Sequence, residues 1–309
     1  MTRRGTVVAA LAAVLAAQAA IQGQQRSEAP PAPADSAASA AARHHYTISA
    51  RVRPLILFWI TRSNVGDAIV ERTRTPEQAT YSLLIGTDPR RTPLRINRWG
   101  YLEEDIRGDE ARLLGVMTQS DEESIEQAEA SVRTQPAGSH PFKIIHATAD
   151  GAEARARVAS INAPQDYTLK QLRAVLDLAE RETAGGTLRV VPMANGTRPG
   201  FLAALADAMH TPAERSISYV YYGRLYHLRR THSSAVPDLR IAARSYGPAV
   251  AADFVITSAH DGEQTKFSLT YGTRGPYAEV PLAASYQPRW WMQIALAIDD
   301  AGADSEPAQ

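Results

Sequence analysis

Apolar and polar residues alternate with a period of two in several parts of the chain, which is the pattern of a strand with one buried face. The first such stretch covers residues 46–53, where the apolar side chains occupy the even positions. Similar stretches predict strands over 81–85, 95–103 and 113–118. A continuous apolar run over 55–60 is typical of a strand buried on both faces.

The last strand that the pattern predicts covers residues 290–298. Its apolar residues fall on one face: Trp290, Met292, Ile294, Leu296 and Ile298. We expect this strand to lie inside the sheet, against a hairpin that turns at Asp261-Gly262. Trp290 should then lie in the core, and Trp291 should point the opposite way.

Two Asp-Gly pairs predict tight hairpins, because this dipeptide tolerates the positive φ angles that such turns require. Asp150-Gly151 and Asp261-Gly262 each separate two strand-like apolar runs. We also expect the chain to turn at residues 64–67, which read Asn-Val-Gly-Asp. The predicted strands therefore follow one another through hairpins.

Three helices are predicted between the strands. Two begin at capping-box patterns, the first running from Ser120 to about residue 132 and the second starting at Thr168. The third lies between Pro199 and Pro212. Strands outnumber helices and do not alternate with them. We therefore predict an α+β fold, with a mainly antiparallel, curved sheet built from hairpins and about three helices.

The N-terminal residues have the layout of a secretory signal peptide: a basic start, a short apolar run and Ala17-Gln18-Ala19. We expect residues 1–19 to be this signal peptide and residues 20–44 to be a disordered linker rich in Ala, Pro and Ser. A single α+β domain is expected over 45–298, and an acidic disordered tail over 299–309. The protein should be periplasmic or secreted, and the short signal and Ala/Arg-rich composition indicate a bacterium.

Composition narrows the chemistry that the chain can perform. The 33 basic and 33 acidic residues give a formal net charge of +0, so no nucleic-acid partner is expected. The chain has no cysteine, which excludes disulfides, thiolate catalysis and Cys-bound metals. No apolar run after the signal approaches the roughly 20 residues of a membrane-spanning helix, so no transmembrane anchor is expected.

The sequence shows no local catalytic motif: no nucleophile elbow, phosphate-binding loop or zinc-binding His-Glu-x-x-His. The eight histidines are poorly spaced for a metal site. His227 and His232, for example, lie five apart on a predicted strand and so face opposite sides. Acidic groups at 103–105 and 121–123 fit a strand surface and a first helical turn. We therefore expect no catalytic residue, no metal ligand and no cofactor.

Aromatic residues interleaved with arginine form the strongest candidate for a binding site. Trp and Tyr rings stack on apolar or sugar-like ligands, while a neighbouring guanidinium can hold a charge. The candidate ligand-binding residues are Tyr222, Arg224, Tyr226, Arg289 and Trp291. The alternative is that these aromatics only fill a core that lacks disulfides.

The function favoured by this reasoning is non-catalytic binding of a small or lipid-like ligand, or of an envelope component, in a concavity lined by the aromatic strands. A secreted hydrolase without a recognisable motif is one alternative. A structural subunit of an envelope complex is another. A closed, buried aromatic cluster would remove support for the first hypothesis.

Overall fold

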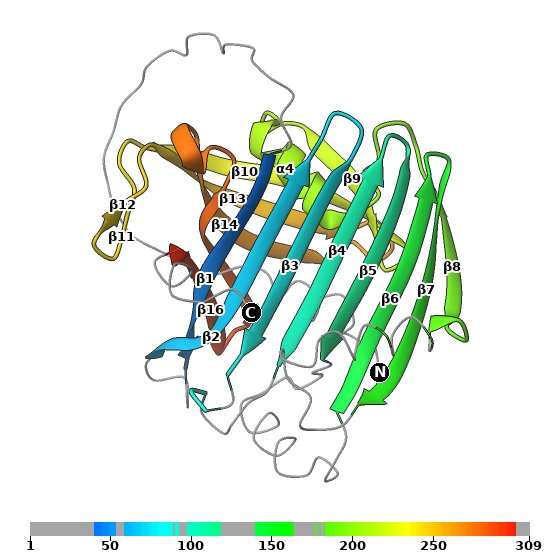
Figure 1. The fold of residues 1–309 in the computed structure, drawn as a ribbon, viewed down its shortest axis with the longest axis horizontal. Helices are drawn as coiled ribbons and strands as arrows, with labels where there is room; N and C mark the ends of the chain where they lie inside the picture. The colour runs from blue at the N-terminus through cyan, green and yellow to red at the C-terminus, as the bar shows by residue number, and fades with distance from the viewer. Residues whose placement is uncertain are drawn as a thin grey trace.

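The computed structural model describes residues 40–53, 59–88, 90–92, 98–118, 140–163 and 183–300, together with Asp177 and Arg181. Fourteen strands of this part form one antiparallel sheet, in the order β8-β7-β6-β5-β4-β3-β2-β1-β16-β15-β14-β13-β10-β9 (Figure 1). The first eight are β1 (Ala40–Val52), β2 (Ile60–Arg74), β3 (Ala79–Thr87), β4 (Trp99–Arg107), β5 (Glu110–Thr118), β6 (His140–Asp150), β7 (Glu153–Ala163) and β8 (Thr187–Pro192). The others are β9 (Ser216–Tyr221), β10 (Arg224–Val236), β13 (Ala249–Ser258), β14 (Gln264–Gly272), β15 (Pro281–Arg289) and β16 (Met292–Ile298).

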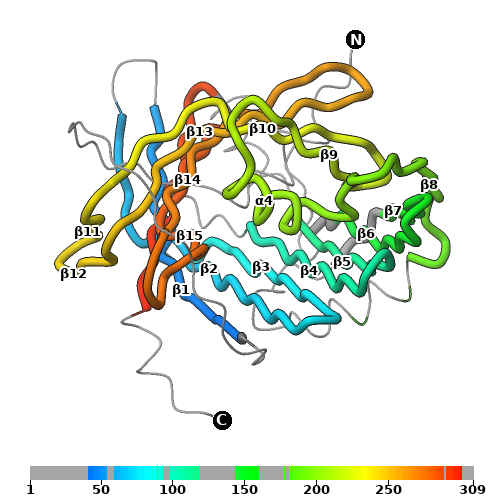
Figure 2. Tube along the Cα trace, turned by 90° about the horizontal axis from the view of Figure 1, so that it is seen from above, coloured from blue at the N-terminus to red at the C-terminus, as the bar shows by residue number. Residues whose placement is uncertain are grey.

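The sheet curls until its two ends approach each other. Strands β1 to β8 form the front layer in Figure 1, and β9, β10, β13 and β14 lie behind them. The first and last strands, β1 and β16, pair in the middle of the sheet, where Tyr46 is opposite Ile298. The two edges of the sheet, β8 and β9, are successive strands with α4 between them, and β8 contacts β10, the neighbour of β9 (Figure 2). The result is a nearly closed, barrel-like sheet.

The predicted α+β class is wrong. Strands make up 66% of the described residues and helical residues 8%. Within that part only α4 (Phe201–His210) is a complete α-helix, which matches the helix expected between Pro199 and Pro212. The helix expected after Ser120 lies outside the described residues, as does most of the one expected after Thr168. The remaining small elements are β11 (Arg240–Ile241), β12 (Arg244–Ser245) and the 3₁₀ turn η4 (Gly275–Tyr277).

The hairpin predictions are confirmed, whereas the turn expected at residues 64–67 is wrong. Gly151 and Gly262 have φ angles of 83° and 73° in the β6–β7 and β13–β14 turns. Residues 64–67 instead continue β2. Asn64 takes a left-handed φ of 56°, and the pairing register between β1 and β2 shifts by two residues at this point. The turn-forming residues therefore bend the strand without ending it.

The space between the two layers is filled with side chains. The interior face of β5, β6 and β7 carries small residues on directly paired positions: Ala111, Ala147, Ala149, Ala154 and Ala156. The β9–β10 turn packs into the room that these residues leave, because a Cβ on Gly223 would meet Ala156 and Arg189. Tyr222 and Gly223 both have positive φ, as a tight hairpin turn requires. Small residues on one layer thus accommodate large aromatics from the other.

The C-terminal strand corrects a second expectation. β16 begins at Met292 and lies between β1 and β15, so it is internal, but β15 separates it from the hairpin at Asp261-Gly262. Trp290 lies in the β15–β16 turn and is 54% exposed, while Trp291 is 6% exposed. The alternation of apolar residues continues two residues beyond the start of β16, because the pattern cannot show where a turn ends and a strand begins. Trp291, not Trp290, is the buried tryptophan.

The first and last described segments are joined to each other. β1 begins at Ala40, so residues 40–44 of the expected linker belong to this strand. The His44 ring nitrogen Nδ1 lies 3.0 Å from an Asp300 carboxylate oxygen, and Asp299 N–H donates to the His45 carbonyl.

Within the described residues, no helix has both the length and the apolar composition needed to cross a membrane.

Candidate functional site

The aromatic candidates on the β9–β10 hairpin are packed into the interior. Tyr226 is 1% exposed and stacks on Tyr219, with ring centroids 5.4 Å apart. Tyr222 is 6% exposed, and its hydroxyl donates to the Met117 sulfur at 3.1 Å. Arg224 is partly exposed at the start of β10. These tyrosines form part of a closed core cluster, which removes the main support for an aromatic-lined concavity.

The other two candidates lie on a different hairpin. Arg289 ends β15, and Trp291 lies in the following turn. Strands β13 and β14 separate β15 from β10, so three inter-strand spacings of about 4.8 Å place the two groups roughly 14 Å apart. Both groups lie at the same end of the sheet. The structure therefore gives five candidate residues in two separate places and not one assembled pocket.

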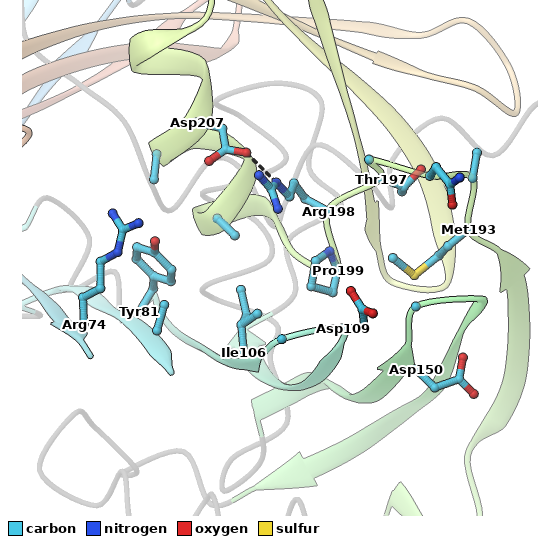
Figure 3. A pocket seen from close by; sticks show the side chains of 18 of the residues that line it. Arg74, Tyr81, Ile106, Asp109, Asp150, Met193, Thr197, Arg198, Pro199 and Asp207 are labelled. Atoms are coloured by element: carbon cyan, nitrogen blue, oxygen red, sulfur yellow. Dashed lines mark hydrogen bonds and ion pairs between the residues drawn. The ribbon is translucent and has the colours of Figure 1, made fainter. Parts of the chain in front are cut away.

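A cleft of about 880 Å³ opens instead at the opposite end of the sheet, beside α4 (Figure 3). One wall is the sheet rim, formed by the ends of β2, β3 and β4 and by the β4–β5 and β6–β7 turns. The other wall is α4 with the segment 193–199 that precedes it. Its volume lies within the range of small-molecule sites in proteins. No local motif in the sequence marks this cleft, because its walls come from distant segments of the chain.

A buried and a partly buried ionisable side chain hold α4 at its two ends. At the N-terminus the two carboxylate oxygens of Glu104, on β4, accept hydrogen bonds from Leu202 N–H at 2.8 Å and Ala203 N–H at 2.9 Å. At the C-terminus the Arg230 guanidinium, on β10, donates to the carbonyls of Met209 at 3.2 Å and Thr211 at 2.8 Å. Each charge matches the helix dipole at its end. The helix is therefore fixed between the two layers of the sheet.

Glu104 is fully buried, and this changes its acidity. Burial raises the pKa of its carboxyl group from the ordinary 4.5 to about 7, although backbone N–H groups of Leu202, Ala203 and Phe201 oppose the rise. Gly200, the N-cap residue, makes room for the carboxyl group, since a Cβ at this position would overlap it. A cap from a distant strand thus replaces the Ser, Thr or Asp that usually precedes a helix.

Two arginines and a histidine gather at one end of the cleft. Arg72 forms an ion pair with Glu279 at 2.7 Å, and His210 lies 3.4 Å from the same carboxylate. Burial would raise the pKa of Glu279, but Arg72 outweighs it and holds the pKa below its usual range. Glu279 has a left-handed φ of 62°, a conformation that non-glycine residues rarely adopt. Arg74 extends the positive charge at this end (Figure 3).

The middle of the cleft carries a second ion pair. The Arg198 side chain binds the Asp207 carboxylate on α4 (Figure 3). The Arg198 backbone also pairs with β9, donating to the Ser218 carbonyl at 2.8 Å and accepting from Val220 N–H at 2.9 Å. The segment before α4 therefore covers the free edge of β9, and it fixes this cleft wall to the sheet.

The far end of the cleft is acidic. Asp109 lies in the β4–β5 turn and Asp150 ends β6 at the β6–β7 turn, where a Cβ on Gly151 would lie 3.1 Å from the Asp109 Cβ. The two turns thus touch. Asp150 accepts hydrogen bonds from the backbone N–H of Glu153 and Ala152, which hold its pKa below the usual value. Both side chains are drawn at this end in Figure 3.

The described residues contain no group of three or more His, Asp or Glu side chains placed to hold a metal ion. The chain matches no protein-family model, no curated protein sequence and no solved structure. The function must therefore be argued from the geometry and charge of the cleft.

Proposed function

We propose that the protein is an exported, non-catalytic binding protein, and that the cleft beside α4 is its binding site for a small polar ligand. The observation that carries this proposal is a cleft of about 880 Å³ whose charged walls are fixed before any ligand arrives. A wall that is already ordered loses little entropy on binding, which favours affinity.

The arrangement of the titratable groups supports binding over hydrolysis. Arg72, Glu279 and His210 are joined in one ion-paired group, and Arg198 and Asp207 form another. Groups held by each other orient a ligand through charge and hydrogen bonds. A general base, by contrast, has to be free to take a proton from the substrate. Among the described carboxylates of the cleft, only Asp109 and Asp150 form no ion pair, and backbone N–H groups hold the pKa of Asp150 below its usual value.

The chemistry of the walls favours a polar ligand over the lipid-like one considered from the sequence. Charged side chains line both ends and the middle of the cleft, and burying them beneath an acyl chain without partners costs free energy. Tyr81 alone among the described large aromatic residues lines the cleft, and most of the rings that an apolar ligand needs are packed inside the sheet.

Native mass spectrometry of protein purified from the periplasm tests this proposal. We expect a co-purifying polar molecule that is lost in Ala194→Trp, because Ala194 is an exposed residue on the cleft wall. Ala235→Trp, an exposed residue of β10 away from the cleft, is the matched control and should retain it. A co-purifying lipid that both variants retain would overturn the proposal.

A further inference from the structure

The two ends of the cleft carry opposite charge. At one end Arg72 and Arg74 face one carboxylate, Glu279, so the basic residues outnumber the acidic ones before His210 is counted. Arg74 is exposed, and no described carboxylate forms an ion pair with it. This end therefore has a guanidinium available to a ligand anion.

The other end is negative. Asp109 and Asp150 lie on touching turns, and within the described chain neither forms an ion pair with a basic side chain. Asp150 is ionised at neutral pH, and two backbone N–H groups of its own turn hold its pKa below the usual value. A ligand cation at this end would meet two carboxylates. Between the ends, Arg198 and Asp207 cancel each other.

Strand spacing gives the separation of the charges. Arg74 ends β2, and Asp150 ends β6, four strands along the same rim. Four spacings of about 4.8 Å give roughly 19 Å, and Asp109, between β4 and β5, lies at roughly 12 Å. An extended peptide advances about 3.3 Å per residue, so four or five residues cover roughly 13–17 Å, a length between the two separations.

The walls between the charged ends mix small apolar and hydrogen-bonding side chains. Apolar groups come from the rim and from the segment around the start of α4: Ile106, Met193, Pro199, Ala203 and Ala206. Asn195 and Thr197 add side-chain donors and acceptors. Tyr81, beside Arg74, is the one Phe, Tyr or Trp among the described lining residues (Figure 3). The stretch between the charged ends therefore suits a main chain with small side chains better than it suits a sugar, which stacks on aromatic rings.

We infer that the cleft binds a short extended peptide of four to five residues, with its terminal carboxylate at Arg74 and its terminal ammonium group at Asp109 and Asp150. This inference rests on the proposed function and specifies the ligand class of that site. The ligand is held by opposite charges at a fixed separation, so length and both free termini determine its affinity.

Isothermal titration with alanine peptides tests the inference. We expect tetra-alanine and penta-alanine to bind, and dialanine to bind at least tenfold more weakly because it cannot reach both ends. Acetylation of the amine or amidation of the carboxylate should each weaken binding about 10- to 100-fold, the usual contribution of a hydrogen bond to a charged group.

Variants assign each terminus to its end of the cleft. Arg74→Gln should weaken binding of the free peptide about tenfold or more and leave binding of the C-terminal amide unchanged. Asp109→Asn should weaken binding of the peptide with a free amine by a similar factor and leave binding of the N-acetylated peptide unchanged. Arg62→Gln is the matched control, because Arg62 is an exposed arginine at the other end of β2.

Different results separate this inference from the proposed function. If an unrelated polar molecule binds and Ala194→Trp blocks it, while no alanine peptide binds, the cleft is a binding site and the peptide inference is wrong. Peptides that bind equally with free and blocked termini would also overturn it. If peptide binding is indifferent to Ala194→Trp, both the inference and the proposed site fail.

Discussion

The buried carboxyl group of Glu104 makes the stability of the protein depend on pH near neutrality. In the unfolded chain this group loses its proton near pH 4.5, whereas burial in the folded protein keeps it protonated to about pH 7. Below pH 4.5 the group is neutral in both states. As the pH rises from 4.5 through 7, the unfolded state releases its proton first, so unfolding becomes more favourable.

The size of this effect follows from the two pKa values. One pKa unit corresponds to about 1.4 kcal/mol, so the interval between 4.5 and about 7 corresponds to about 3 kcal/mol. This is a large share of the roughly 5–15 kcal/mol that stabilises a typical folded protein. Most of the loss should occur between pH 5 and pH 7.5.

Urea unfolding followed by tryptophan fluorescence measures the effect, at intervals from pH 4.5 to pH 8. Glu104→Gln keeps the shape of the side chain and removes the titration, so the difference in unfolding free energy between wild type and variant isolates Glu104. Between pH 4.5 and pH 8 the wild type should lose about 3 kcal/mol of unfolding free energy relative to Glu104→Gln. Glu103→Gln is the control, because the neighbouring Glu103 faces outward and is bound by the Tyr101 hydroxyl.

A difference between wild type and Glu104→Gln that stays constant from pH 5 to pH 8 would refute this reasoning. It would mean that the backbone N–H groups of α4 stabilise the carboxylate enough to cancel the effect of burial. Equal pH dependence in Glu103→Gln and Glu104→Gln would show that the titrating group lies elsewhere.

Three further predictions can be checked by urea unfolding and by mass spectrometry. Gly200→Ala should lower the unfolding free energy by about 2–4 kcal/mol, because the added methyl group displaces the helix cap; wild-type stability would contradict this. Trp291→Ala should lower the unfolding free energy by about 3–5 kcal/mol, and Trp290→Ala, at an exposed position, by less than about 0.5 kcal/mol. The reverse order would show that Trp290, and not Trp291, is the buried ring. The exported protein should begin within one residue of Ala20, which the intact mass determines; a mass that includes Met1 would exclude cleavage.

The sequence predicted those elements whose cause is local. The hairpins at residues 150–151 and 261–262 formed as expected, because an Asp-Gly pair determines its own turn. The helix at α4 was also found from its flanking prolines. The predicted fold class was wrong because the helix patterns in the sequence are as clear as the strand patterns. The patterns therefore do not show that strands make up most of the fold.

The cleft could not be found in this way, because its parts are distant in the chain. Arg74 and Asp207 are brought together only when α4 docks on the rim of the front layer. The cap of α4 is supplied by Glu104, almost a hundred residues away, and the sequence shows only three acidic residues in a row. The Gly200 that precedes a helix with no Ser, Thr or Asp cap was the one local sign that a distant group caps it.

The pairing of β1 with β16 has a consequence for how the chain reaches its fold. Every other pairing in the large sheet joins strands that are successive members of that sheet, although β11 and β12 lie between β10 and β13, while this one joins its first and last strands. Closing so long a loop is entropically costly, so the two halves of the sheet should form separately and join last. A circular permutant that links Asp300 to Ala40 and opens at the exposed residues Asn195 and Gly196 would make that pairing local. It should fold faster than the natural order of the chain while keeping the same sheet.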